Sequence, residues 1–463
     1  MSNACYGAVT WGGVSRGEPR GNDPPERNSA IYDVGFLIDD WPGGTAGALL
    51  TSEIINPTSK IPRSGGSLSR GYMPPLAWID AELDVLRQRD LLRELPAPFD
   101  LQTATIEVAG QRLINFASND YLGLAADPRL VDAAAEACRA TGVGRGSSPL
   151  VCGRSTLHAE LERRLAEFEH AEAALLFPSG FAANAGVVPA LADRGDAIFA
   201  DAKNHASLID GCRLSRAAIH VYRHNDADHL AELLAAHAKI ARRSLIVTDT
   251  LFSMDGDVAP LAEIAALARR YGSMLLIDEA HATGVFGTTG RGLAEAAGVE
   301  QEGLIRIGTL SKALGAAGGF VVGPVSLISY LANRARSYVF STAQPASTAA
   351  AAMVALNLVA AEPERGAQLL ATAAGLRQRL QAAGWNTGDS ASQIIPIHIG
   401  PAAEALTLSG RLRQAGFWVP AIRPPSVPAG ESLLRLSLTA SHTAEMVGAL
   451  LKELGTAQDA MGP

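Results

Sequence analysis

The sequence predicts an α/β protein whose core is a mostly parallel, buried β-sheet. Short runs of aliphatic and β-branched residues recur through the middle of the chain, and apolar patterns of helical spacing separate them. Of the 463 residues, 48% are hydrophobic and 19% are charged, which is enough apolar material for a large core. Continuous apolar strands joined by helical crossovers are typical of a parallel sheet covered on both faces. The predicted strands are residues 173–177, 197–200, 219–222, 244–248, 274–277 and 304–307.

The crossovers between these strands are helical patterns at residues 182–191, 208–216, 230–240 and 261–271. After Pro345 the alternation stops, and long helices lead into a few separate strands. This mixture predicts a smaller α+β unit at the C-terminus. Its predicted helices are 346–361, 365–383 and 403–415, and its predicted strands are 394–399, 433–438 and a short one around Trp418.

The length suggests two or three domains, and the patterns divide the chain into four segments. Residues 1–75 are rich in Gly, Pro and Ser and lack apolar periodicity, so we expect a disordered extension. It has neither the apolar stretch of a signal peptide nor the acid-poor composition of a transit peptide. The other segments are an N-terminal helical segment at 76–112 with a helix over 76–95, a large domain at 113–343 and the α+β domain at 344–463.

Charge and cysteine content exclude several classes of protein. A net charge of −8 argues against a nucleic-acid binder, because neutralising phosphates requires a basic surface. Four cysteines are too few for a disulfide framework and show no metal-ligand spacing, so we expect no metal. The sequence contains no run of 18 apolar residues, which is the length that would predict a membrane span. These observations favour a cytoplasmic enzyme that binds neither nucleic acid nor membrane.

The segment 275–284, LLIDEAHATG, contains the first candidate site residues. A buried strand delivers Asp278 and His281 to its carboxyl end, where open α/β sheets bind ligands. The acid alone is compatible with a metal ligand, a helix cap or a partner for a cationic ring nitrogen. The likeness to the DEAH box of ATPases is superficial, because the chain has no GxxxxGK[ST] phosphate loop.

Lys312 is the second candidate, in the segment IGTLSKALGAAGG at 307–319. Small residues and glycines surround it, and no carboxylate is near it in sequence. A lysine in such a place loses its charge easily and can form a Schiff base. An Asp at one strand end and a Lys after another are two parts of a pyridoxal 5′-phosphate (PLP) site.

Two further motifs fit such a site. Ser179, Gly180 and Phe181 lie between a predicted strand and a predicted helix, and the amides at a helix start bind phosphate. His205 follows the strand 197–200; a helix-capping or core histidine is the alternative to an imidazole stacked on a pyridine ring.

Several separated motifs together resemble the α-oxoamine synthases. These fold-type I PLP-dependent transferases join an amino acid to an acyl thioester with loss of CO2. The resemblance covers roughly residues 78–455 and implies a mostly parallel seven-stranded sheet sandwiched by helices, a smaller α+β C-terminal domain and a homodimer. The motifs, in order, are 115–124 (NFASNDYLGL), 179–184 (SGFAAN), 205–208, 252–257 (FSMDGD), 278–284 and 309–312.

The resemblance implies a role for each candidate residue. Lys312 would form the Schiff base with PLP, and His205, Asp278 and His281 would be the other catalytic residues. Gly180, Phe181, His205, Ser253, Asp278, His281 and Thr309 would contact the cofactor. Arg435 would bind the carboxylate of the amino acid, and Arg93, Asn119, His205, Arg423 and Ser426 would line the rest of the substrate site.

The C-terminal segments 421–430 (AIRPPSVPAG) and 433–443 (LLRLSLTASHT) narrow the substrates. They resemble the biotin-pathway branch of the family, which uses L-alanine and pimeloyl-CoA or pimeloyl-acyl carrier protein. Ser426 stands where a Thr is common. The glycine-using members, 2-amino-3-ketobutyrate CoA ligase and 5-aminolevulinate synthase, are the alternative. A catalytically silent partner subunit is a third hypothesis, which the retained Lys312 disfavours.

Overall fold

The computed structural model describes residues 74–98, 101–300 and 303–461. The extension predicted at 1–75 lies outside the described residues except for its last two. Residues Pro74–Pro463 form one compact unit. Within the described part of the chain, no single helix is long and apolar enough to cross a membrane, and one bent helix pair, Ala346–Ala361 with Glu364–Ala382, passes on length and composition only.

A seven-stranded sheet forms the centre of the fold, and its strand order is β3-β9-β8-β7-β6-β4-β5. Only β9 runs antiparallel within this sheet, to β3 on one side and β8 on the other. The mostly parallel sheet is confirmed. Its strands are β3 (Ala173–Phe177), β4 (Ala197–Asp201), β5 (Ala218–Tyr222), β6 (Ser244–Asp249), β7 (Met274–Asp278), β8 (Leu304–Thr309) and β9 (Gly319–Gly323).

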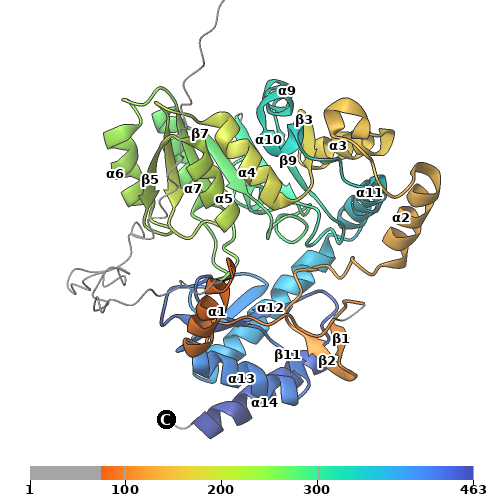
Figure 1. Cartoon of the computed structure of the whole chain (residues 1–463), viewed down its shortest axis with the longest axis vertical. Helices are drawn as coiled ribbons and strands as arrows, with labels where there is room; N and C mark the ends of the chain where they lie inside the picture. The colour runs from red at the N-terminus through yellow and green to blue at the C-terminus, as the bar shows by residue number, and fades with distance from the viewer. Residues whose placement is uncertain (1–73, 99–100, 301–302, 462–463) are drawn as a thin grey trace, which may run out of the picture. The chain divides into compact units, whose positions relative to one another are not determined.

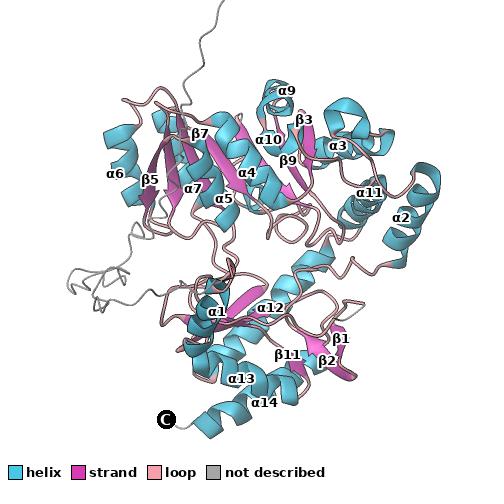
Figure 2. Ribbon diagram, in the orientation of Figure 1, coloured by secondary structure: helices cyan, strands magenta, loops and turns pink. Residues whose placement is uncertain are grey.

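Helices cover both faces of this sheet, as Figures 1 and 2 show. Successive strand residues point to opposite faces, so Leu275 and Ile277 join one apolar cluster while Leu276 joins the other. Residues of α4 (Gly180–Leu191), α5 (Ala206–Ser215), α9 (Val325–Arg334) and α10 (Arg336–Val339) belong to the cluster with Leu276. The cluster with Leu275 includes residues of α2 (Pro128–Thr141), α3 (Thr156–Phe168), α6 (Ala227–His237), α7 (Leu261–Tyr271), α8 (Leu293–Ala296) and α11 (Ala346–Ala361).

Two three-stranded sheets, with orders β10-β13-β12 and β1-β2-β11, lie outside the central sheet. Their strands are β1 (Thr105–Val108), β2 (Gln111–Asn115), β10 (Ile394–Gly400), β11 (Phe417–Trp418), β12 (Ala421–Ile422) and β13 (Ser432–Ser437). The C-terminal helices are α12 (Glu364–Ala382), α13 (Ala402–Gln414) and α14 (Ala444–Met461). The predicted domain boundary between 343 and 344 stays a prediction.

The N-terminal helix is shorter than predicted. We expected a helix over 76–95, but α1 spans Trp78–Gln88. Asp90 adopts a left-handed conformation with φ of 56°, and the amide of Leu91 donates to the carbonyl of Leu86. A left-handed residue of this kind terminates a helix, because the following amides turn back to its last carbonyls.

Candidate active site

The carboxyl edge of the central sheet gathers the candidate polar residues. Asp278 ends β7, and Asp249, which ends β6, is its register partner on the neighbouring strand. Thr309 ends β8 in the same sheet. Parallel strands bring their carboxyl ends to one edge, which is where α/β sheets bind ligands. Both aspartates are buried.

A chain of hydrogen bonds starts at Lys312. Its Nζ lies 2.8 Å from Nε2 of His281, whose Nδ1 lies 2.5 Å from the hydroxyl of Tyr121. The Tyr121 hydroxyl donates to Oδ1 of Asn119 at 3.2 Å. Because an ammonium group only donates, Nε2 of His281 accepts from a charged Lys312 and Nδ1 carries the hydrogen. His281 is therefore a neutral relay between the lysine and the tyrosine.

Burial lowers the pKa values of both Lys312 and His281. It lowers the pKa of Lys312 to about 8, even though the carboxylates of Asp278 and Asp249 favour the charged form. Burial, followed by the positive charge of Lys312, holds the pKa of His281 well below its usual value. Lys312 thus becomes a neutral amine at a much lower pH than an exposed lysine does.

Asp278 is held in place by donors on two sides. Its Oδ2 accepts from Nδ2 of Asn184 at 2.6 Å, and its Oδ1 accepts from the amide of Ala280 at 2.8 Å. The same Asn184 nitrogen donates to Oγ of Ser207 at 2.9 Å. These bonds fix the carboxylate plane, and the Oδ1 of Asn184 is buried without a hydrogen-bond partner.

His205 stands at the start of α5 and is tied to the same edge of the sheet. Its amide donates to Oδ2 of Asp249 at 2.7 Å, and its Nδ1 lies 2.7 Å from Oγ of Ser207. Its ring meets the ring of Phe181 edge-on, with centroids 6.5 Å apart. Burial, with the negative charge of Asp278 adding to it, raises the pKa of Asp249 well above its usual value.

The start of α4 lies beside Thr309. The Oγ of Ser179 caps the helix by accepting from the amide of Ala182 at 3.0 Å. A Cβ built on Gly180 would lie 3.4 Å from Cβ and 3.5 Å from Oγ1 of Thr309, so the helix start and Thr309 are in van der Waals contact range. The amides of Gly180 and Phe181 belong to the first turn, where a helix binds anions.

Arg435 extends the polar group to the C-terminal region. It lies on β13, 5% exposed, between the buried Leu434 and Leu436. Its Nε donates to the carbonyl of Ser253 at 2.5 Å, and its Nη1 donates to Oδ1 of Asn119 at 3.2 Å. Asn119 therefore joins Arg435 to the chain that begins at Lys312.

Arg93, Arg423 and Ser426 form a different group, around the turn that follows β12. Arg93 donates to the carbonyls of Arg423 and Pro424, and Arg423 donates to the carbonyls of Asp90 and Leu92. Ser426 is exposed, and its amide donates to the carbonyl of Arg423. These bonds attach the segment after α1 to the turn, whereas Asn119 and Arg435 are bonded into the group around Lys312.

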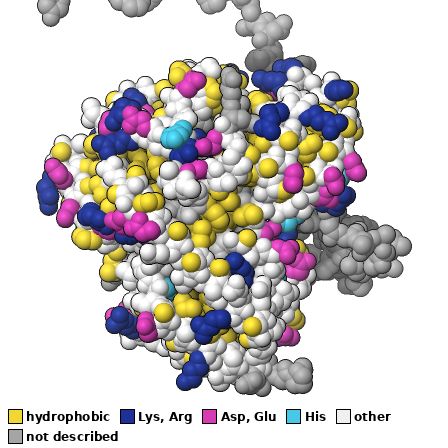
Figure 3. All heavy atoms as spheres, turned by 180° about the vertical axis from the view of Figure 1, so that it is seen from behind, with side chains coloured by type: hydrophobic (Ala, Val, Ile, Leu, Met, Phe, Trp, Pro, Cys, Tyr) yellow, Lys and Arg dark blue, Asp and Glu magenta, His cyan; other side chains and the backbone are white. Residues whose placement is uncertain are grey.

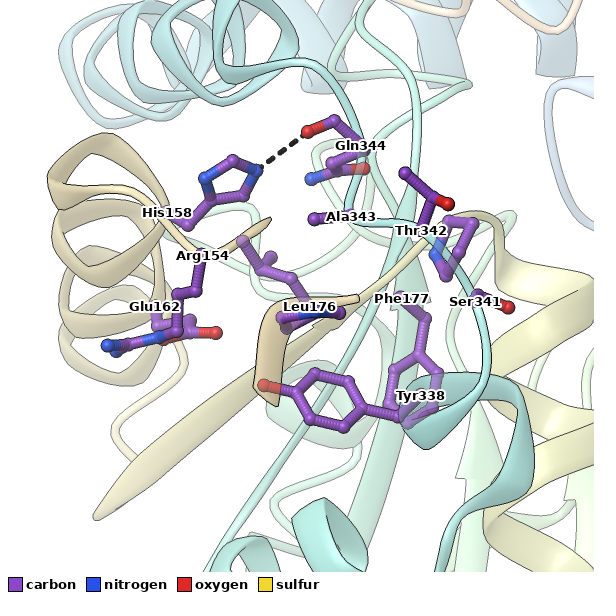
Figure 4. A pocket seen from close by; sticks show the side chains of 12 residues that line it. Arg154, His158, Glu162, Leu176, Phe177, Tyr338, Ser341, Thr342, Ala343 and Gln344 are labelled. Carbon is purple, nitrogen blue, oxygen red and sulfur yellow. Dashed lines mark hydrogen bonds and ion pairs between the residues drawn. The ribbon is translucent and has the colours of Figure 1, made fainter. Parts of the chain in front are cut away.

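A small cavity is lined by residues of α3, β3 and α10 (Figure 4). Its volume of about 20 Å³ is enough for one water molecule. Figure 4 shows His158, which bonds to the carbonyl of Gln344, near one end and Tyr338 near the other. The side-chain amide of Gln344, which also lines the cavity, is buried without a hydrogen-bond partner.

Sequence reasoning missed several residues that the structure brings to the site, namely Tyr121, Asn184, Ser207, Asp249 and Gln393. Tyr121 and Asn184 lie inside the motifs 115–124 and 179–184, so those motifs were the available signal. Asp249 directly follows the predicted strand 244–248, as Asp278 directly follows the predicted strand 274–277. Gln393, which donates to the carbonyl of His281 at 2.8 Å, has no local signal.

The donors and acceptors at this edge suit one kind of ligand. The first turn of α4 and the hydroxyl of Thr309 suit an anionic group, a fixed carboxylate at Asp278 suits a protonated ring nitrogen, and Lys312 suits a carbonyl carbon. The unpartnered Oδ1 of Asn184 adds an acceptor beside Asp278. Among the residues described, no group of three or more His, Cys, Asp or Glu side chains could hold a metal ion.

Comparison with known proteins agrees with this arrangement. The family model "Aminotransferase class I and II" matches residues 111–454. The 8-amino-7-oxononanoate synthase of Anaeromyxobacter dehalogenans is 50% identical over 379 residues, which are 82% of this chain and 95% of that protein.

Solved structures are similar too. A serine palmitoyltransferase from S. paucimobilis with bound PLP-myriocin has a TM-score of 0.78 and 31% identity, covering 84% of this chain and 98% of that one. The 8-amino-7-oxononanoate synthase of Francisella tularensis has a TM-score of 0.65 and 27% identity, covering 75% and 98%.

The fold and the site therefore define an enzyme of the class I and II aminotransferase fold, built to use PLP. Within that class, the chain belongs to the 8-amino-7-oxononanoate synthases, the PLP-dependent acyltransferases of biotin biosynthesis.

Proposed function

We propose that the chain condenses L-alanine with a pimeloyl thioester to give 8-amino-7-oxononanoate, CO2 and a free thiol. The observation that carries this proposal is the bonded chain from Arg435 through Asn119, Tyr121 and His281 to Lys312. It connects a guanidinium, which suits a carboxylate, with an amine whose pKa is lowered. The names of the relatives support the two substrates.

The residues at the sheet edge fit PLP, and we assign its holders from the contacts above. Lys312 would hold it covalently through Nζ, and the amides of Gly180 and Phe181 with the Thr309 hydroxyl would take its phosphate. Asp278 would pair with its ring nitrogen. When bound, PLP supplies an electron sink that stabilises negative charge at the α-carbon of the amino acid.

Several uncharged side chains would contact the cofactor or orient the residues that hold it. His205 would lie over the cofactor ring, because its position is fixed by Asp249 and Ser207. His281 and Ser253 would add contacts to the cofactor. Asn184 orients the Asp278 carboxylate by donating to it, as outer hydrogen-bond partners orient functional groups.

Lys312 and Arg435 would act on the amino acid. Arg435 would bind the carboxylate of L-alanine with its planar fork of donors. Lys312, as a neutral amine, would take the proton from the α-carbon, and an amine with a pKa of about 8 suits a base that works near neutral pH. The neutral His281 holds Nζ at 2.8 Å and does not compete for the proton.

The acyl donor would bind on the side of Arg93, Arg423 and Ser426. Backbone carbonyls orient both guanidiniums but do not neutralise them, so their charge still attracts an anionic thioester. We propose pimeloyl-CoA or pimeloyl-acyl carrier protein as the donor.

A substrate panel tests the reaction. Purified protein loaded with PLP is mixed with L-alanine and pimeloyl-CoA or pimeloyl-acyl carrier protein, and released thiol and 8-amino-7-oxononanoate are measured. The other arms are glycine with acetyl-CoA or succinyl-CoA, and L-serine with palmitoyl-CoA. We expect product in the alanine arms, and none from a Lys312→Ala variant. Thiol release only with glycine or serine would contradict the proposed substrates.

We also propose that the enzyme works as a homodimer in the cytoplasm. The exposed apolar side chains support a dimer: Leu150 and Val151 are 53% and 78% exposed on the π-helical turn Pro149–Gly153, and Phe340 is 70% exposed at the end of α10. The turn and α10 are in contact, and contiguous apolar surface favours association. Figure 3 shows apolar side chains gathered across the middle of one face. Analytical ultracentrifugation gives the mass in solution; a monomer at micromolar concentration would contradict the dimer.

A further inference from the structure

His224 lies between two carboxylates in the loop that joins β5 to α6. Its Nδ1 is 2.8 Å from Oδ1 of Asp201, and its Nε2 is 2.7 Å from Oδ2 of Asp257. An ionised carboxylate only accepts hydrogen bonds, so both ring nitrogens carry a hydrogen and the ring is an imidazolium. The side chain is 19% exposed.

The other charged groups nearby have partners of their own. Nζ of Lys203 pairs with Asp255 at 3.1 Å, and Nε of Arg223 pairs with Asp226 at 2.8 Å. His224 is thus the cation placed directly between Asp201, which ends β4, and Asp257. Burial alone would lower the pKa of His224, but the hydrogen bonds to the two carboxylates outweigh it and raise that pKa to about 9.

Asn225 makes further hydrogen bonds to the same two aspartates, Asp201 and Asp257. The amide of Asn225 donates to Oδ2 of Asp201 at 2.9 Å, and its Nδ2 donates to Oδ2 of Asp257 at 2.8 Å. His224 and Asn225 together therefore link the end of β4 to the loop that contains Asp257. The ring of Phe252 lies edge-on to the ring of His224, with centroids 4.4 Å apart.

Asp257 closes the turn 252–257, and this turn holds Arg435. The amide of Phe252 donates to the carbonyl of Asp257 at 3.1 Å, which folds the turn back on itself. The carbonyl of Ser253 accepts from Nε of Arg435 at 2.5 Å. The carbonyl of Gly256 accepts from the amide of Ala391 and the hydroxyl of Ser392, so the turn also joins the central sheet to the C-terminal region.

We propose that His224 is a positioning residue for substrate binding: as an imidazolium it fixes the turn 252–257 to β4, and the turn fixes the guanidinium of Arg435. The inference rests on the proposed function in one respect, that Arg435 binds the carboxylate of the amino acid. His224 touches neither substrate nor cofactor in this scheme. Its loss weakens binding of the amino acid and leaves the proton transfer at Lys312 in place.

The test compares His224→Gln with His237→Gln in the PLP-loaded full chain. Glutamine is neutral and has a single side-chain nitrogen. It therefore cannot donate to the two carboxylates from opposite sides, as the imidazolium of His224 does. His237 is a matched control, because it lies on α6 with its ring stacked on His220 at 4.0 Å, away from the turn. For His224→Gln we expect the KM for the amino acid to rise about 10-fold to 100-fold, the cost of a misplaced binding group, with a much smaller change in kcat. The KM for the thioester and all constants of His237→Gln should stay near those of the unaltered chain.

Proton NMR of histidine-labelled protein supplies a readout that does not depend on activity. We expect one imidazole signal to titrate with a midpoint near pH 9, and to titrate at lower pH in Asp257→Asn. If that signal titrates near pH 6.5, or if His224→Gln folds and keeps the KM of the unaltered chain, the inference is wrong. Turnover of glycine or serine instead of alanine overturns only the proposed substrate, because the KM comparison and the NMR titration are then made with that amino acid.

Discussion

Lys312 owes its chemistry to where its amine is buried. Burial favours the neutral amine, while Asp278 and Asp249 on the adjacent strand ends favour the ammonium, and the first effect is larger. His281 lies 2.8 Å from Nζ and is itself neutral, because burial and the charge of Lys312 hold its pKa well below the usual value. The positive charge of Arg435 also lowers the pKa of Lys312, so the lysine exchanges a proton closer to neutral pH than an exposed lysine does.

This balance predicts how Lys312 reacts in the cofactor-free protein. Its reductive methylation should rise through a midpoint near pH 8, because only the neutral amine reacts and its pKa is about 8. In Asp278→Asn the midpoint should fall further, since that carboxylate raises the pKa of Lys312. Peptide mass spectrometry across pH 6 to 11 measures both, and a midpoint near that of an ordinary lysine, about 10.4, would disagree.

Arg435 allows a second test at the level of a single side chain. Arg435→Lys keeps the charge but loses the planar fork and the bonds to Ser253 and Asn119, so the KM for L-alanine should rise by about 10-fold to 100-fold. Arg411→Lys, on the exposed surface of α13, is the control. Steady-state kinetics measures the KM of both variants. Equal KM values would show that Arg435 does not bind the substrate carboxylate.

The sequence identified those side chains of the site that have distinctive local surroundings. Lys312 among glycines and Asp278 at the end of an apolar run were predicted, and both lie at the carboxyl edge of the sheet. Asn184 and Asp249 were not singled out although each had a local signal, because that signal does not show the partners they contact 94 and 44 residues away. Gln393 had no local signal, and its partner His281 is 112 residues away. No local pattern carries such separations.

At the level of elements, the turn after β8 determines where Lys312 sits. Gly315 has φ of 58°, and a Cβ there would lie 2.5 Å from the amide nitrogen of Ala125 and 2.6 Å from the carbonyl carbon of Leu124. The turn therefore packs directly on the backbone of another segment. Since both contacts are with backbone atoms, neither can move aside as a side chain would.

A pair of glycine substitutions separates the cost of a positive φ from the cost of overlap with backbone atoms. Gly298→Ala also changes a residue with positive φ, 64°, but meets nothing within 4 Å, so it should cost about 1 kcal/mol. Gly315→Ala should cost about 2 kcal/mol more because of the added overlap with the backbone. Urea unfolding measures both free energies of unfolding. Equal losses would mean that the turn does not press on residues 124 and 125.

The sequence predicted those strands that are runs of apolar residues between helical patterns. Strands without such a run were not predicted. The six predicted strands of the central sheet are present, and the helix 261–271 has the predicted bounds. β9 was missed because glycines are the first and last of its five residues and it follows the glycine-rich segment after Lys312. β1 and β2 were missed because they are only four and five residues long and half or more of those residues are polar, and because β2 pairs with the distant β11.

For the whole molecule, buried neutral histidines make folding sensitive to acid. His442 stacks on Phe116 with centroids 4.3 Å apart, accepts from the amide of Thr439 and lies 3.1 Å from the carbonyl of Asn115. Burial lowers its pKa to about 4. It thereby joins the start of α14 to the end of β2.

The sign of the effect follows from linkage. Between pH 6.5 and pH 4 the unfolded chain binds a proton at His442 and the folded chain does not, so stability falls as the pH falls through this range. The loss should approach about 3 kcal/mol, from 1.4 kcal/mol per pKa unit. Thermal unfolding from pH 7 to pH 4.5 should show a shallower pH dependence for His442→Gln than for the unaltered chain. Parallel curves would assign the acid sensitivity to other groups.

The pairing of β2 with β11 affects how the chain is made. Ile114 pairs with Phe417, so the hairpin formed by β1 and β2 leaves the ribosome long before its third strand exists. At 5 to 20 residues per second, the intervening 303 positions take about 15 to 60 s to synthesise. During that interval the edge of β2 has no strand to pair with. All seven strands of the central sheet are therefore synthesised before the three-stranded sheet β1-β2-β11 can form.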